Sequence, residues 1–188
     1  SSPNYPIALS NNIRTYLRGR DKPASWNILV AKDGRVIQSV SCLKAAWHVG
    51  RPGTIAGRAV GNVNQHTVGI ELENSGRLIL LDNVYYCWPY WVNPDADPSF
   101  LVPDLMWVVE SSRAVAVGEE YYDDFPAAQV AAATAVVKAL VIRFKWTREV
   151  CLYGHKDFAQ GAKEDQGPRW QNTVLPGVLD NVFGPAVA

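Results

Sequence analysis

The chain has 188 residues, of which 48% are hydrophobic and 19% charged, so it can bury a sizeable core and differs in composition from disordered proteins. Lys and Arg together number 18, as do Asp and Glu, and this balance gives no basic signal for binding nucleic acid or an anionic membrane. The length suits one domain with an insertion. No apolar run approaches the ~20 residues of a transmembrane helix. The opening residues do not resemble a signal peptide, and a mature or trimmed chain would look the same.

The first elements are predicted to be a helix and a β-hairpin. Apolar residues recur on one helical face between residues 9 and 17. Two β-rich runs follow, residues 26–30 and 36–40, and Asp33-Gly34 between them is a strong hairpin signal. The three cysteines are too few and too widely spaced for a disulfide framework, and Cys42 and Cys151 lie in apolar runs, where we expect buried thiols.

The middle of the chain is predicted to hold an exposed loop and then a strand. Residues 51–65 are rich in Gly, Arg and Asn and predict an exposed loop. Apolar residues alternate with Gly69, Glu71 and Glu73 over residues 68–73, which is the period of a strand. A carboxylate on a central strand is costly to bury unless it is paired or functional, so we expect both glutamates to be either paired, functional or solvated.

Residues 76–124 are interpreted as an insertion of loops and short strands. The insertion contains an aromatic cluster, Tyr85 to Trp91, followed by a loop rich in Pro and Asp. Such a cluster is able to line a glycan groove, anchor a partner or form a satellite core under a long loop. The satellite core is favoured because the surrounding Pro and Asp residues do not build a flat sheet.

The C-terminal third is predicted to contain a helix, a strand, a loop and a last helix. Residues 126–144 carry one apolar stripe, and Pro126 suits a first helical turn. The apolar run Val150 to Tyr153 predicts a short buried strand, and a loop rich in Gly, Lys and Asp follows it. Residues 176–183 predict a short terminal helix.

Two side chains in the loop after residue 153 have metal-binding chemistry. His155 follows the predicted strand, and Asp165 lies ten positions later. An imidazole and a carboxylate suit Zn²⁺, which takes N and O ligands. The ammonium of Lys163, two residues before Asp165, would stabilise an oxyanion formed at such a metal. The alternative is a hydrogen-bonded His beside a solvated surface loop.

The segment GHKDFAQGAKEDQGP resembles the C-terminal signature of the zinc-dependent N-acetylmuramoyl-L-alanine amidases, whose pattern is roughly G-H-x-D-x-A-P-G-x-K-x-D-P-G-P. Gln160 and Gln166 replace two of the usual prolines. The matching residues are Gly154, His155, Asp157, Ala159, Gly161, Lys163, Asp165, Gly167 and Pro168.

Three earlier segments resemble the same family. Residues 25–34 match a hairpin of the form S-x-H-x-x-I-x-x-D-G, except that Asn27 stands where His is usual, and residues 46–50 match A-W-H-x-G. Residues 64–73 are similar to N-x-x-S-I-G-I-E-L-E. The resemblance implies a substrate-binding groove that includes Trp26, Trp47, His48 and Asn64. The alternative is that Trp47 is a core residue and His48 a capped loop residue.

The resemblance also implies a fold and a reaction. The expected fold is α/β, a mixed central β-sheet flanked by helices, with a groove along one face. The expected reaction is hydrolysis of the amide between N-acetylmuramic acid and L-alanine of peptidoglycan, as in cell-wall lytic amidases. His155 and Asp165 would bind Zn²⁺, Glu71 would act as the base that polarises the zinc-bound water, and Lys163 would stabilise the oxyanion. For Glu73 we expect a solvated or salt-bridged strand residue.

A third zinc ligand is missing from the match. Family enzymes use a His at the end of an opening strand, and the other histidines here, His48 and His66, follow no such strand. Three explanations remain, in order of preference: the ligand precedes Ser1, the protein binds peptidoglycan without cutting it, or His48 or His66 has been recruited.

Two other functions remain open. One is a non-catalytic peptidoglycan-binding module, and the other is a structural phage or assembly protein that retains the amidase scaffold and uses the aromatic insertion. Both as an enzyme and as a binding module, the protein is expected to bind peptidoglycan and to act at the cell wall.

Overall fold

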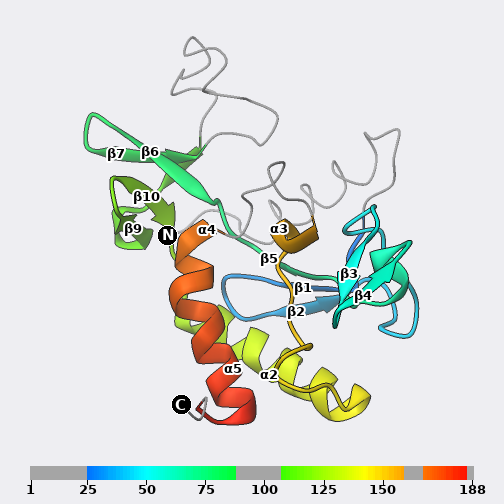
Figure 1. Cartoon of the computed structure of the whole chain (residues 1–188). Coiled ribbons are helices and arrows are strands. Elements are labelled where there is room, and N and C mark those ends of the chain that lie inside the picture. The colour runs from blue at the N-terminus through cyan, green and yellow to red at the C-terminus, as the bar shows by residue number, and fades with distance from the viewer. Residues whose placement is uncertain (1–24, 88–106, 159–166, 186–188) are drawn as a thin grey trace. The chain divides into compact units, whose positions relative to one another are not determined.

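The computed structural model describes residues 25–87, 107–158 and 167–185 (Figure 1). The chain forms two compact units: unit 1 comprises Ser1–Leu29 and Val36–Glu71, and unit 2 comprises Val30–Arg35 and Leu72–Ala188. The helix predicted within residues 9–17 lies outside the described residues, as do Lys163 and Asp165.

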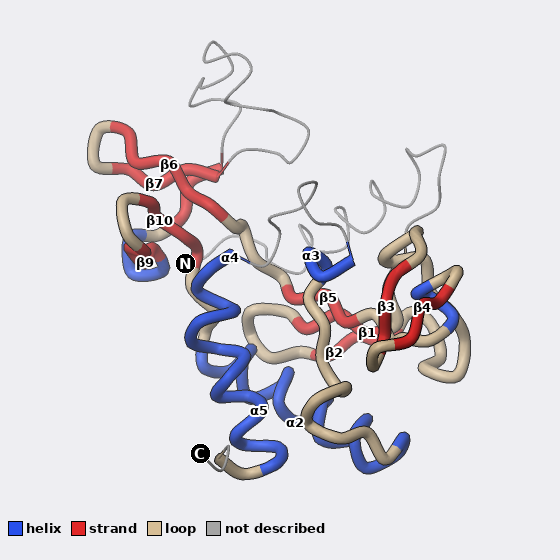
Figure 2. The backbone as a smooth tube through the Cα atoms, in the orientation of Figure 1, coloured by secondary structure: helices blue, strands red, loops and turns tan. Residues whose placement is uncertain are grey.

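A three-stranded sheet has the order β2-β1-β5, with β1 at Ile28–Val30, β2 at Val36–Gln38 and β5 at Ile70–Leu72 (Figure 2). β1 and β2 form the predicted hairpin. The backbone N–H of Asn27 donates to Gly69 O, and that of Glu73 donates to Val30 O. These pairings advance in the same direction along both strands, so β1 and β5 are parallel and the sheet is mixed, as expected.

The turn between β1 and β2 requires its glycine. Gly34 has φ +85°, and its N–H donates to Ala31 O to close the turn. A Cβ at this position would lie 2.9 Å from the carbonyl oxygen of Ala128. Asp33-Gly34 therefore forms the hairpin and also permits the close approach of the helix that carries Ala128.

The stretch 51–65 is largely exposed as predicted, except for the buried Val63 and Asn64, but it is not only a loop. It contains the antiparallel hairpin of β3 (Gly53–Ile55) and β4 (Arg58–Val60), followed by the 3₁₀-helix η1 (Val63–Gln65). Ala56 and Gly57 both have positive φ, at 49° and 75°, as a two-residue hairpin turn of type I′ requires. Alanine is unusual in that conformation, and the sequence therefore gives no hairpin signal here.

Residues 76–124, interpreted from the sequence as an insertion, contribute a five-stranded sheet with the order β8-β7-β6-β10-β9, here called the insertion sheet. Its neighbouring strands pair antiparallel. Leu78, Cys87 and Val109 form a small buried cluster, against which Tyr85 and Tyr121 pack. Tyr85 and Cys87 thus belong to a small core, as expected, while Trp88 to Trp91 lie outside the described residues. The strands are β6 (Arg77–Leu81), β7 (Val84–Cys87), β8 (Trp107–Val109), β9 (Ala114–Val117) and β10 (Glu120–Asp123), and the 3₁₀-helix η4 (Ser111–Arg113) precedes β9.

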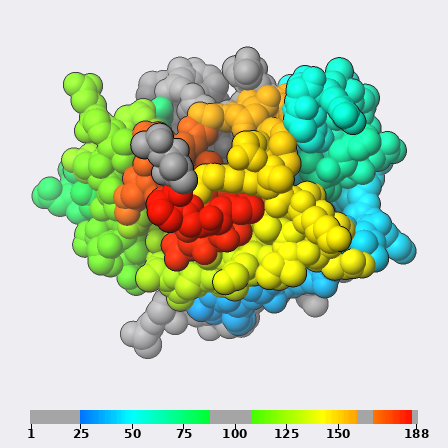
Figure 3. All heavy atoms as spheres, turned by 60° about the horizontal axis from the view of Figure 1, so that its bottom comes forward, coloured from blue at the N-terminus to red at the C-terminus, as the bar shows by residue number. Residues whose placement is uncertain are grey.

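The predicted long helix is α2 (Ala127–Phe144), and its first turn follows Pro126. α5 (Leu175–Phe183) packs against α2 (Figure 3). α5 continues a helical segment made by α4 (Gly167–Arg169) and the π-helical turn η5 (Trp170–Val174), so the terminal helix begins earlier than predicted. By length and composition alone α2 would be able to cross a membrane, a test that core helices of soluble proteins also pass.

Residues 150–153 do not form the predicted strand. Val150 N–H donates to Thr147 O, and the thiol of Cys151 contacts Arg148 O, so local turn contacts replace a strand ladder. Leu152 and Tyr153 then lead into the short helix α3 (His155–Phe158). A four-residue apolar run is too short to distinguish a strand from a buried turn. Cys151 is buried as expected, but Cys42 is only half-buried.

Candidate active site and substrate-binding loop

Asn27, which stands where the family usually has His, is fully buried beneath the loop of residues 41–49, here called the Trp47 loop. Its Nδ2 donates to Ser41 O and Lys44 O, both at 3.0 Å. Its Oδ1 accepts the N–H of Gly69 at 2.9 Å. All its side-chain donors and its acceptor are therefore used, and one amide ties the Trp47 loop to the segment that enters β5.

Asn64 holds the other end of the same loop. Its Oδ1 accepts the backbone N–H groups of Val49 at 2.9 Å and His48 at 3.3 Å. The side chain is 2% exposed. Asn64 therefore fixes the backbone that follows Trp47. Its predicted role in substrate binding stays a prediction.

The His48 ring is held by two oxygen atoms. Nδ1 lies 2.9 Å from Ala46 O, and Nε2 lies 2.9 Å from the hydroxyl of Thr67. The ring also covers Gly69, where a Cβ would lie 2.7 Å from His48 Cγ. A metal ion at either ring nitrogen would displace one of these contacts, so the geometry argues against His48 as a recruited zinc ligand.

Trp47 is presented to solvent by this loop. Its backbone N–H donates to Ser25 Oγ, and its carbonyl accepts from Ser25 N–H. The side chain is 55% exposed, so the alternative that Trp47 is a core residue is wrong. Trp26 is half-buried just before β1. Among the four predicted substrate-binding residues, Trp47 has the exposure that stacking on a ligand requires.

The two glutamates of β5 and its C-terminal flank have different environments. Glu71 is exposed on β5. Glu73 is half-buried in unit 2, where its carboxylate accepts the backbone N–H of Lys32 at 3.1 Å. Glu73 thus contacts backbone from a position just after β5, where a solvated or salt-bridged strand residue was expected, and Glu71 is exposed to solvent.

His155 begins α3 in unit 2, and the flanks of residues 159–166 are anchored there. The carboxylate of Asp157 accepts the N–H of Gly154 at 2.6 Å, and the ammonium of Lys156 donates to the side chain of Gln171. After the gap, Arg169 donates to the carboxylate of Asp124 at 2.9 Å. The described residues on both sides of segment 159–166, which carries Lys163 and Asp165, are thus hydrogen-bonded within unit 2.

The metal-ligand prediction is not tested by the described residues and stays a prediction. They include no group of three or more His, Cys, Asp and Glu side chains placed to hold a metal ion. Of the two predicted ligands, His155 is described and Asp165 is not. His66 is exposed at the end of η1. A three-ligand zinc site is therefore not assembled within the described part of the chain.

A buried ion cluster in unit 2 was not predicted from the sequence. The carboxylate of Asp123, 1% exposed, pairs with the ammonium of Lys32 and with the guanidinium of Arg113 at 2.7 Å. It also accepts the N–H of Ser75 at 2.9 Å. Burial raises the pKa of the Asp123 carboxyl, but Lys32 and Arg113 outweigh it and hold the pKa below its ordinary value. The cluster joins the β1–β2 turn to the insertion sheet.

The mixed sheet and its helices define an α/β protein, and two solved amidases share the fold. AmiD from E. coli, in complex with anhydro-N-acetylmuramic acid-L-Ala-D-gamma-Glu-L-Lys, matches with a TM-score of 0.58 and 22% identity over 95% of this chain and 54% of that chain. A selenomethionine derivative of AmpD matches with a TM-score of 0.51 and 21% identity over 84% of this chain and 61% of that chain. The chain thus spans little more than half the length of these proteins.

The family model for N-acetylmuramoyl-L-alanine amidase matches residues 2–168. This match includes all four segments whose motifs resemble the family, and the chain belongs to the N-acetylmuramoyl-L-alanine amidase family. No match was found among curated proteins.

Proposed function

We propose that this protein is a zinc-dependent peptidoglycan amidase that hydrolyses the bond between N-acetylmuramic acid and L-alanine. The family match over residues 2–168 is the observation that carries the proposal. The muropeptide bound to the structurally similar AmiD supports the same class of substrate. The Trp47 loop supplies an exposed aromatic surface on which a sugar ring or a stem peptide would stack.

Four residues of this chain would carry the metal-binding and catalytic roles. His155 and Asp165 would hold Zn²⁺, together with a third ligand not identified in this chain. When bound, zinc polarises a carbonyl and lowers the pKa of water. The Glu71 carboxylate would accept a proton from the attacking water. The Lys163 ammonium would stabilise the oxyanion, a contribution worth about 3 kcal/mol.

The decisive experiment measures release of new L-alanine amino groups from a soluble muropeptide. The wild-type protein is expected to release them only with zinc present, and Lys163→Ala is expected to lose roughly a hundredfold in kcat while zinc content stays unchanged. His155→Ala is expected to lose both zinc and activity. Glu73→Gln is the control for Glu71→Gln, because Glu73 is bound to the Lys32 backbone. Full activity of Lys163→Ala would contradict the assignment of Lys163.

A non-catalytic peptidoglycan-binding module is the second candidate. It is favoured by one observation: no three-ligand metal site is formed by the residues that the structure describes. Such a module would bind muropeptides, contain no zinc and release no amino groups. Zinc content and product release, measured on one preparation, separate the two candidates.

A further inference from the structure

The backbone of Trp47 is held on both sides by one residue, Ser25. The N–H of Trp47 donates to the hydroxyl oxygen of Ser25 at 3.0 Å, and the N–H of Ser25 donates to Trp47 O at 2.9 Å. Ser25 lies 22 residues earlier in the chain, just before β1. Trp47 lies between β2 and β3, outside the described strands and helices. The contacts with Ser25 therefore replace, at Trp47, the hydrogen bonds that a strand would make.

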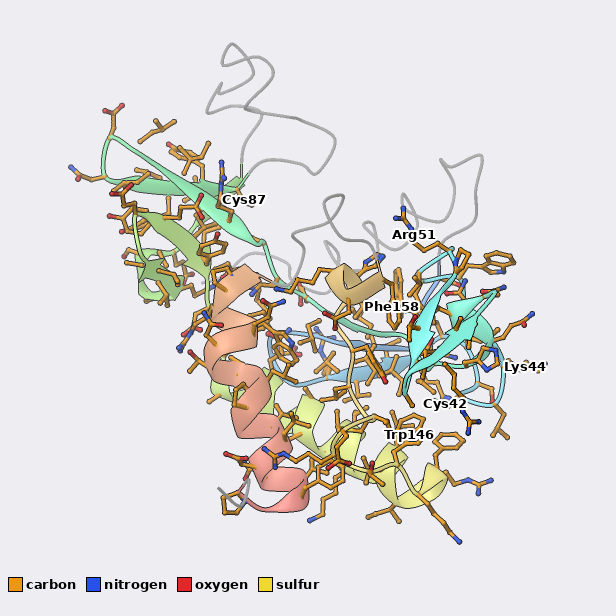
Figure 4. All side chains as sticks on the ribbon, viewed as in Figure 1. Cys42, Lys44, Arg51, Cys87, Trp146 and Phe158 are labelled. Carbon is orange, nitrogen blue, oxygen red and sulfur yellow. The ribbon has the colours of Figure 1, made fainter. Side chains whose placement is uncertain are left out.

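These two contacts restrict the direction of the Trp47 side chain. Because peptide groups are planar, fixing the N–H and the C=O of one residue restricts its φ and ψ, and the Cα–Cβ bond then has a set direction. Packing restrains the ring only in part, since the side chain is 55% exposed and the three residues 43–45 on the same loop are exposed as well. Figure 4 shows one of them, Lys44, extending away from the ribbon. The orientation of the indole therefore depends on its backbone.

Ser25 differs from the two asparagines that hold the same loop. Asn27 and Asn64 fix the backbone before and after Trp47, and both side chains are buried. Removing a buried amide leaves its partners unsatisfied, which affects the whole fold. Ser25 is half-buried and contacts Trp47 itself. Its hydroxyl is therefore the group whose loss tests the orientation of Trp47 in a folded protein.

We propose that Ser25 is a positioning residue for muropeptide binding, because its hydroxyl holds the Trp47 backbone so that the exposed indole is presented to the ligand in one orientation. The inference rests on the proposed function, since the ligand is the muropeptide of that reaction. A ring that is already oriented loses less conformational entropy when a sugar or a peptide stacks on it, so binding is tighter. Ser25 acts through Trp47, and its effect is on binding and not on bond cleavage.

The test is a double-mutant cycle of Ser25→Ala and Trp47→Ala in the full chain with zinc present. The probe is N-acetylmuramoyl-L-alanyl-D-isoglutamine, which contains the amide bond of the proposed reaction. Initial rates give KM and kcat, and equilibrium dialysis gives Kd if the wild-type protein leaves the probe intact. Thermal unfolding checks that each variant is folded.

Three further variants separate the hydroxyl from other effects. Ser25→Thr retains the hydroxyl, and Ser25→Cys replaces it with a weakly accepting thiol of similar shape. Thr134→Ala is the control, because it removes one hydroxyl contact with a backbone carbonyl, Val130 O, in unit 2.

Ser25→Ala is expected to raise KM or Kd about threefold with kcat unchanged, because the hydroxyl acceptor for Trp47 N–H is lost. Trp47→Ala is expected to raise it roughly tenfold, and the double variant no further. Ser25→Thr and Thr134→Ala should match the wild type, and Ser25→Cys should lie between the wild type and Ser25→Ala.

A further rise when Ser25→Ala is added to Trp47→Ala would overturn the proposal, because Ser25 would then act independently of Trp47. Unchanged binding in both Ser25→Ala and Ser25→Cys would overturn it too. So would a loss confined to kcat, or an equal loss in Thr134→Ala.

The wild-type protein tests the proposed function separately. Binding of the probe without release of amino groups would reject the amidase function, and the effect of Ser25→Ala on Kd would still decide the role of Ser25. Normal hydrolysis with the same KM in the wild type and in Ser25→Ala would reject the positioning role alone. A wild-type protein that neither binds nor cleaves the probe would reject both.

Discussion

Asp123 and Lys32 form a buried ion pair although they lie 91 residues apart in the chain. Lys32 belongs to the turn between β1 and β2, and Asp123 ends β10 of the insertion sheet. Arg113 supplies a second cation to the same carboxylate. The insertion sheet is therefore joined to the hairpin by a buried charge cluster. Breaking this cluster is expected to cost more free energy of unfolding than breaking an exposed ion pair.

Replacing Asp123 by Asn is expected to lower the free energy of unfolding by about 3–5 kcal/mol, because Lys32 is left buried without its counter-charge. Urea denaturation measures this loss. Glu120→Gln is the matched control, since it removes an exposed pair with Arg77 in the same sheet and should cost no more than about 1 kcal/mol. Similar losses in the two variants would show that the buried cluster contributes no more to the free energy of unfolding than the exposed pair.

The Asp123 pair also predicts how stability depends on pH. The pKa of Asp123 lies below its ordinary value of 3.8 because the two cations outweigh the effect of burial. A carboxyl with a depressed folded-state pKa stabilises the protein above pH 3.8, and this contribution is lost as the pH falls through the folded-state pKa. Carbon NMR of the Asp123 carboxyl should show a midpoint below 3.8, whereas a midpoint at or above 3.8 would contradict the pairing.

Local sequence signals predicted the elements whose formation depends mainly on residues close together in the chain. Asp33-Gly34 predicted the first hairpin, and the apolar stripe predicted α2. The β3–β4 hairpin was missed because Ala56 occupies a positive-φ position that usually requires Asn, Asp or Gly. The strand predicted at residues 150–153 was wrong because a short apolar run does not specify a pairing partner.

The candidate site was predicted less completely than the fold, for a physical reason. Motif resemblance identifies residue types, but burial and hydrogen bonding decide what each one contacts. Asn64 matched a family position, yet it lies buried and holds backbone N–H groups. The Lys32–Asp123 pair depends on tertiary proximity across 91 residues, and a lysine in a turn has no sequence feature that predicts burial.

Gly69→Ala should displace the His48 ring. The new Cβ would lie 2.7 Å from His48 Cγ and 2.8 Å from Nδ1, so the ring has to leave Ala46 O or Thr67 Oγ1. The expected loss is about 1–3 kcal/mol of unfolding free energy, as for other overpacked sites. Gly61→Ala is the control in the same unit, because nothing lies within 4 Å of its Cβ. Equal stability of the two variants would show that His48 adapts without cost.

Asn27→Asp should loosen the Trp47 loop with almost no change in side-chain size. The substitution keeps an acceptor for Gly69 N–H but removes the two donors that hold Ser41 O and Lys44 O. It also places a carboxylate oxygen against those carbonyls in a buried site, and we expect a loss of about 3 kcal/mol. Amide hydrogen exchange in residues 41–49 should accelerate at the same time, and muropeptide binding should weaken because Trp47 is no longer held in place.

Asn181→Asp is the control for this change, because Asn181 is exposed on α5 and its single amide contact is with Gly177 O. A surface substitution of this kind is expected to change stability by no more than about 0.5 kcal/mol. If Asn27→Asp destabilises the protein but leaves exchange in residues 41–49 and muropeptide binding unchanged, the amide supports the sheet and not the Trp47 loop. If both change together, the residue that replaces the family's usual His is the one that positions the exposed tryptophan.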